Sequence, residues 1–253
     1  KKVPNPKKPI SLGLNSKLVK ENGKLVEKVW KLGGMYNKEI KNIIYWLSKA
    51  SEVAENEKQK EGFELLIKYY ETGDLSIWDQ YNVAWVETVK GDVDYINGFI
   101  EVYNDPKGYR GSYESVVQIK DFEMSKKMDA LSENAQWFED NSPIMEKHKK
   151  NNVVGISYNT VNVASEAGDA SPSTPIGINL PNANWIRVEH GSKSISLGNI
   201  LYAYGNAGSS GRLNEFAFSQ KEIDLEIKHG ENAGSLHTAL HEVIGHASGK
   251  INE

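Results

Sequence analysis

The chain has 253 residues, 39% of them hydrophobic and 25% charged, which is ordinary for a globular protein able to bury a sizeable core. Its 30 basic and 34 acidic residues give a formal net charge of −4, so we expect no nucleic-acid partner and interpret the basic run at 147–150 as a solvated loop. The absence of cysteine excludes disulfides and cysteine-based zinc sites and is compatible with a cytoplasmic location. No apolar run long enough for a signal peptide or a membrane span follows Lys1, so we expect no membrane partner.

The first half of the chain is predicted to be mainly helical. Residues 1–15 carry prolines at positions 4, 6 and 9 and indicate an extended segment. From Asn37, the expected N-cap, apolar residues recur every three or four positions up to residue 54, which predicts an amphipathic helix. The same spacing over 63–70 predicts a second helix that ends at 72–74, and a shorter third helix begins at Leu75.

Strands and helices mix in the second half. A strand is predicted at 113–120, followed by a helix from Asp121 that ends at 141–143. Further along, we predict a strand pair or a bent strand at 153–164, a loop at 165–175 and a short strand at 176–180 that is broken by Pro181. Two helices are predicted after it, at 196–203 and at about 235–247. This order of elements is typical of an α+β fold and not of repeated βαβ units.

The most informative stretch is His241-Glu242-Val-Ile-Gly245-His246 near the C-terminal end. Neutral imidazoles bind Zn²⁺, and a carboxylate beside the metal can take a proton from the bound water. Histidines four residues apart lie about 40° apart on a regular helix, but the spacing of five found here separates them by about 140°. Either the helix accommodates an extra residue in a π-type bulge, which Gly245 makes easier, or the pair is not a metal site.

His237 offers a different ligand pair. It lies four residues before His241, so these two side chains share one face of a regular helix and could hold a metal without any bulge. The spacing alone leaves both pairings open.

Three blocks of sequence resemble the dipeptidyl peptidase III family. The stretch from His241 to Lys250 resembles that family's His-Glu-x-x-x-His zinc motif and the Ser-Gly-Lys that follows it. The other two blocks, which lie upstream in the family's order, are Gly98-Phe-Ile-Glu101-Val-Tyr103-Asn-Asp-Pro106 with Gly108, Arg110 and Gly111, and Gly177-Ile-Asn179-Leu-Pro-Asn182 with Ile186-Arg187 and 196–201. The sequence of residues 11–19 resembles that of the bacterial branch of the family.

This resemblance implies two lobes with an active-site cleft between them, a mixed lobe with a small β core and a mostly helical lobe that carries zinc. We expect residues 1–122 and 151–195 in the mixed, substrate-binding lobe, and 123–150 and 196–253 in an incomplete helical lobe. The family's third zinc ligand is a glutamate on a later helix, so we expect the chain to be an internal segment that is inactive alone.

The resemblance also implies roles for individual residues. His241 and His246 would bind Zn²⁺, and Glu242 would act as general base toward a zinc-bound water. Glu101, with Tyr103 nearby, would hold the ammonium group of a short peptide with a free N-terminus. Asn179 and Asn182 would hold the peptide's backbone groups, as in β-augmentation. Without the family blocks, Glu101 would be interpreted as an acid at a helix end and both asparagines as turn residues around Pro181.

The expected function is therefore that of a zinc-dependent dipeptidyl aminopeptidase, which releases dipeptides from the N-termini of short peptides. Within the hydrolases, the alternative is another zinc peptidase that shares only the motif. Outside them, the alternative is a peptide-binding module that has lost catalysis, and a purely structural helical protein would explain none of the three blocks.

Overall fold

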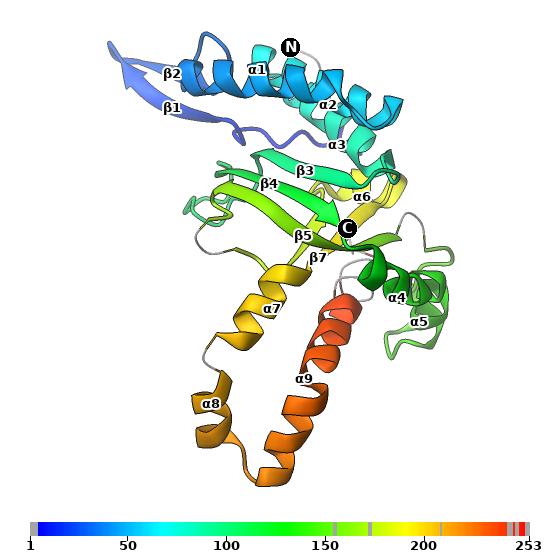
Figure 1. Ribbon diagram of the computed structural model, residues 1–253. Helices are drawn as coiled ribbons and strands as arrows, with labels where there is room; N and C mark the ends of the chain where they lie inside the picture. The colour runs from blue at the N-terminus through cyan, green and yellow to red at the C-terminus, as the bar shows by residue number, and fades with distance from the viewer. Residues whose placement is uncertain are drawn as a thin grey trace. The chain divides into compact units, whose positions relative to one another are not determined.

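The computed structural model describes residues 5–153, 156–171, 174–207, 209–241, 245 and 248–250. Helices and strands are mixed along the chain, with a small sheet among them, which confirms the predicted α+β class (Figure 1). The fold contains two compact units. Unit 1 comprises Lys1–Ser115, Ala167–Asp169 and Pro181–Gly191, and unit 2 comprises Val116–Glu166, Ala170–Leu180 and Ser192–Glu253.

Unit 1 begins with an antiparallel hairpin that is absent from the predicted elements. Strands β1 (Ser16–Glu21) and β2 (Lys24–Val29) pair along their whole length, with Glu21 opposite Lys24. The two residues between them, Asn22 and Gly23, have φ values of 49° and 78°. Asparagine and glycine accept such angles most readily, and this pair forms the turn that matches the twist of a two-residue hairpin.

The helices of unit 1 pack around an aromatic core. They are α1 (Asn37–Glu52), α2 (Glu57–Thr72), α3 (Leu75–Glu87) and the short α6 (Asn184–Glu189). The first three confirm the predicted helices. Tyr69 and Tyr70 of α2 are fully buried, and Phe63 stacks on Tyr95 with ring centroids 4.4 Å apart. The predicted N-cap of α1 is wrong by one residue, because Asn37 is the first residue of the helix and Tyr36 is its N-cap. The Asn37 side chain accepts a hydrogen bond from the Gly33 N–H.

The five remaining strands have the order β3-β4-β5-β7-β6, so β6 lies at an edge. Their bounds are β3 (Val93–Phe99), β4 (Tyr113–Lys120), β5 (Ile156–Gly168), β6 (Gly177–Leu180) and β7 (Ser192–Leu197). β4 has its predicted boundaries and β6 starts one residue late. β5 is a single strand that continues into the predicted loop at 165–175, whereas β3 and β7 are absent from the predicted elements.

In unit 2, β7 pairs in parallel with β5 and antiparallel with β6. The helices of this unit are α4 (Phe122–Glu133), α5 (Ala135–Asn141), α7 (Gly198–Asn206), α8 (Ser209–Phe216) and α9 (Gln220–Leu240), with a 3₁₀ turn at Glu146–His148. The helix predicted from Asp121 is confirmed but is divided at Asn134. α7 and α9 contact each other and run in opposite directions, joined by α8 (Figure 1). Within the described ranges, no helix is both long enough and apolar enough to cross a membrane.

Candidate functional site

Three of the predicted substrate-binding residues come together in unit 1. Glu101 lies in the loop that follows β3 and not at a helix end, so that alternative interpretation is wrong. The Asn182 side chain donates a hydrogen bond from Nδ2 to Glu101 Oε1 at 3.1 Å. The exposed Tyr103 hydroxyl also hydrogen bonds Glu101, and the negative charge of that carboxylate raises the pKa of Tyr103. One carboxylate therefore organises a tyrosine and an asparagine that are far apart in the sequence.

Glu114 interacts electrostatically with two further carboxylates of unit 1, those of Glu101 and Asp169. Burial, together with the charges of Glu101 and Asp169, raises the pKa of Glu114 to about 7. Asp169 is held in place by its backbone N–H, which donates to the Tyr113 carbonyl at 2.8 Å, and by Asn104 Nδ2, which donates to its Oδ1 at 2.9 Å. We call Glu101, Glu114 and Asp169 the carboxylate cluster.

Glu114 was not among the sequence candidates, although the sequence contains a signal for it. Residues two apart on a strand share a face, so Glu114 in β4 lies on the same face as Val116 and Gln118, both of which are fully buried. An acidic residue on the buried face of a strand is costly unless it has a partner or a function. This signal becomes visible once the strand and its buried face have been assigned.

The raised pKa of Glu114 predicts a dependence of stability on pH. Its ordinary value is 4.5, so between about pH 4.5 and about pH 7 the folded chain holds a proton that the unfolded chain has released. The free energy of unfolding therefore falls as pH rises through this interval. Glu114→Gln stays neutral and should gain about 1–2 kcal/mol over the wild type between pH 5 and pH 8. Urea unfolding of the full-length protein at both pH values measures this gain, and an equal difference at both would contradict it.

Asn179 lies in unit 2, on the edge strand β6. Its Nδ2 donates hydrogen bonds to the side-chain oxygens of Ser194, at 2.5 Å, and Ser192, at 3.3 Å, both on the neighbouring strand β7. Its Oδ1 is buried and has no hydrogen-bond partner among the described residues. A buried acceptor without a partner costs free energy. Asn179 and Asn182 belong to different units, and Asn182 is the one that hydrogen bonds Glu101 within unit 1.

The histidine motif begins where α9 ends. His241 keeps helical backbone angles, and its N–H donates to the carbonyls of both His237 and Thr238. The backbone at His241 and at Gly245 is π-helical. Glu242 and His246 lie outside the described residues. In a π-type turn the hydrogen bond runs between residues five apart, which places such residues one above the other on one face. The described part of the motif therefore has the distortion that its spacing requires.

This backbone fits a metal site built from His241 and His246, two imidazoles that ligate zinc well. Elsewhere, His237 is exposed one helical turn before His241. No group of three His, Asp or Glu side chains with metal-binding geometry occurs within the described part of the chain.

A model of peptidase family M49 matches residues 14–253, which is nearly the whole chain. The chain belongs to peptidase family M49. This membership confirms the resemblance to dipeptidyl peptidase III and places the chain in a metallopeptidase family.

Curated relatives and a solved structure agree with this assignment. Dipeptidyl peptidase 3 of Dictyostelium discoideum is 30% identical over 220 residues, which are 86% of this chain and 30% of that protein. The Rattus norvegicus protein of the same name is 28% identical over 220 residues, or 86% of this chain and 29% of that one. The structure of DPP III from Caldithrix abyssi superposes with a TM-score of 0.79 at 23% identity, over 92% of this chain and 43% of that one, and so shares the fold. The chain thus spans about 30% of the length of these curated relatives.

Proposed function

We propose that the chain is part of a zinc-dependent dipeptidyl aminopeptidase that releases dipeptides from the N-termini of short peptides. The observation that carries this proposal is the π-helical backbone at His241 and Gly245, in a chain that belongs to a peptidase family. That backbone is what a His-Glu-x-x-x-His motif needs if its two histidines are to share one metal. The segment by itself would be inactive, because it supplies two of the three protein ligands that a catalytic zinc site uses.

In this proposal, His241 and His246 hold Zn²⁺, which when bound would polarise the scissile carbonyl and increase the acidity of water. Glu242 accepts the proton of the attacking water and then returns it to the leaving amine. Because Glu242 is adjacent to His241 in the sequence, its side chain points about 100° away from that ligand on a helix. It is thus suited to proton transfer beside the metal and not to ligation on the same face.

The carboxylate cluster would hold the peptide's free ammonium group. Burial, together with the charges of Glu101 and Asp169, raises the pKa of Glu114, and a bound cation would offset the repulsion among the carboxylates. Tyr103 and Asn182 already hydrogen bond Glu101 and so fix the direction in which its carboxylate points. An anchor for the N-terminal charge is what an enzyme needs to measure a distance of two residues from the end of a peptide.

The backbone of the peptide would be held by Asn179 and by the edge strand that carries it. β6 ends the strand order, so its outer backbone groups can pair with an extended peptide as an added strand. The buried Asn179 Oδ1 would accept a peptide N–H, while Asn182 lies beside the anchor. We further propose that the two predicted lobes, with their boundaries at 122, 150 and 195, separate peptide binding from metal binding. The cysteine-free sequence supports a cytoplasmic location.

A second candidate is a peptide-binding module without catalysis. The carboxylate cluster and the unpartnered Asn179 oxygen favour it, because both could bind a peptide in the absence of a metal. This candidate and the enzyme share a binding site but differ in whether a peptide bond is broken.

The experiment that tests the proposal is product analysis with the full-length, zinc-loaded protein. Mass spectrometry should find dipeptides released from an unblocked octapeptide and almost none from its N-acetylated form. Glu101→Gln should lower kcat/KM for the unblocked peptide by about 30- to 150-fold, since a hydrogen bond to a charged group contributes roughly 2–3 kcal/mol. Glu64→Gln, an exposed acid of the same unit, is the matched control and should leave kcat/KM unchanged. Release of single amino acids, or equal cleavage of the acetylated peptide, would contradict the proposal.

A further inference from the structure

Helix α5 contacts the chain on both sides of the histidine motif. Ala135, in the first turn of α5, lies in one buried cluster with Ala239, which is fully buried and precedes His241 by two residues. Glu139, four residues further along α5, accepts hydrogen bonds from the backbone N–H of Gly249, which follows His246 by three residues. Residues four apart lie on one face of a helix, so a single face of α5 contacts both ends of the motif.

The Glu139 carboxylate is fully buried and accepts hydrogen bonds from backbone amides. Gly249 N–H lies 3.1 Å from Oε1 and 3.0 Å from Oε2, and Lys150 N–H lies 2.5 Å from Oε1. Burial of a charge is costly unless hydrogen bonds replace its hydration, and bonds to an ionised acceptor are about twice as strong as neutral ones. The carboxylate therefore connects three segments, α5, the loop at 149–150 and the residues after the motif.

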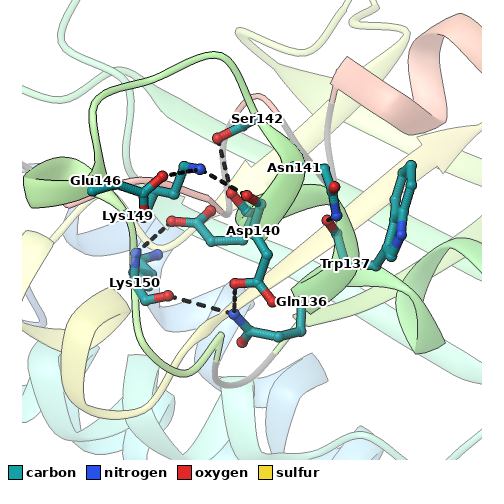
Figure 2. A network of polar contacts seen from close by, with 9 residues as sticks. Gln136, Trp137, Asp140, Asn141, Ser142, Glu146, Lys149 and Lys150 are labelled. Atoms are coloured by element: carbon teal, nitrogen blue, oxygen red, sulfur yellow. Dashed lines mark hydrogen bonds and ion pairs between the residues drawn. The ribbon is translucent and has the colours of Figure 1, made fainter.

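The loop that follows α5 is itself tied down. Figure 2 shows Lys149, whose Nζ donates to the Asp140 carbonyl at 2.7 Å and to Glu146 Oε1 at 2.6 Å. Gln136 donates from Nε2 to Asp140 Oδ1 at 2.8 Å (Figure 2). The Lys250 N–H in turn donates to the His148 carbonyl at 2.7 Å. The residues after the motif are thus hydrogen bonded to a loop that is itself held by hydrogen bonds to α5.

Gly249 makes this attachment possible through its backbone. Its φ is +78°, a left-handed angle that residues with a side chain rarely adopt. The glycine therefore terminates the motif segment and turns its own N–H toward Glu139.

We propose that Glu139 is a positioning residue for the metal site, an inference that rests on the function proposed above. By fixing Gly249, Glu139 sets where the segment after His246 lies, while Ala135 fixes the segment before His241. A π-type turn is a strained form of helix, and it persists where the surrounding structure holds it. Glu139 holds this turn from its C-terminal side and acts on the metal through the backbone, without being a ligand.

Glu139→Gln tests this role with little change in size. In the wild type, both carboxylate oxygens of Glu139 accept hydrogen bonds from backbone N–H groups. The glutamine amide has only one acceptor oxygen, so its NH₂ group would face one of these N–H groups. In the full-length protein, we expect zinc affinity, measured by competition with a chelator, to fall about 10- to 100-fold. We also expect faster hydrogen exchange at the Gly249 and Lys150 amides and altered visible bands in the Co²⁺-substituted protein. Glu139→Asp, which keeps the charge but is shorter, should recover part of the affinity.

Asp140→Asn is the matched control, because Asp140 is the next residue of α5, is exposed, and has a side chain bonded to Gln136 and not to Gly249. It should bind zinc like the wild type. Zinc affinity of Glu139→Gln within twofold of the wild type would overturn the inference, as would global unfolding of both Glu139 variants, since the role proposed is local. Failure of the wild type to bind zinc would instead overturn the proposed function.

Discussion

Glu242→Gln in the full-length protein is expected to lower kcat by about 10²- to 10⁴-fold and to leave KM nearly unchanged, which is the contribution usually made by a general base. Glutamine has nearly the same size and can still accept a hydrogen bond from water, but it cannot take a proton. Zinc content should therefore stay the same, because Glu242 is proposed as a base and not as a ligand. Steady-state kinetics on an unblocked peptide, together with metal analysis, measure both quantities.

Glu231→Gln is the control for this variant, since Glu231 is an exposed glutamate of α9 that lies outside the motif. It should keep wild-type kcat. A Glu242→Gln protein that cleaves peptides at the wild-type rate would show that another group serves as base. Full-length wild type and variant proteins that bind peptides equally well and cleave none would favour the non-catalytic binding module.

The elements that could be predicted from the sequence are those whose apolar spacing matches a single buried face. The helix α2 and the strand β4 are of this kind, and both agree with their predictions. β7 (Ser192–Leu197) could not be found in this way, because all six of its residues are buried although half of them are serines. The hydroxyls of Ser192 and Ser194 accept hydrogen bonds from Asn179 on β6, and such pairing follows from the tertiary fold. The hairpin at Asn22-Gly23 did carry a local signal, the Asn-Gly turn pair.

In the candidate site, too, some features could be predicted from the local sequence and others depend on the tertiary fold. The five-residue spacing of the histidines left two interpretations open, a π-type distortion or no metal site, because the geometry of a helix is local, and the structure has a π-helical backbone at His241 and Gly245. Glu101 was singled out by its resemblance to a family block, and its hydrogen bond with Asn182 joins residues that are distant in the sequence. The raised pKa of Glu114 required the structure, since it arises from burial and from the charges of Glu101 and Asp169.

The two proposed metal ligands, His241 and His246, can be tested by substitution. His241→Ala and His246→Ala should each weaken zinc binding by roughly 100-fold or more, since changes beyond the ligands themselves already cost about 10- to 100-fold. Loss of either imidazole leaves the metal with fewer than the three protein ligands that a catalytic zinc site uses. His237→Ala should have little effect, because a π-type turn would bring residues five apart onto one face, and His237 lies one turn before His241.

The zinc content of the full-length protein and these three variants after dialysis distinguishes the two possible pairs of histidine ligands. We predict one zinc ion per chain in the wild type and in His237→Ala, and almost none in His241→Ala and His246→Ala. Zinc lost from His237→Ala but kept by His246→Ala would contradict the account, because the metal would then use the pair of histidines spaced four apart on a regular helix.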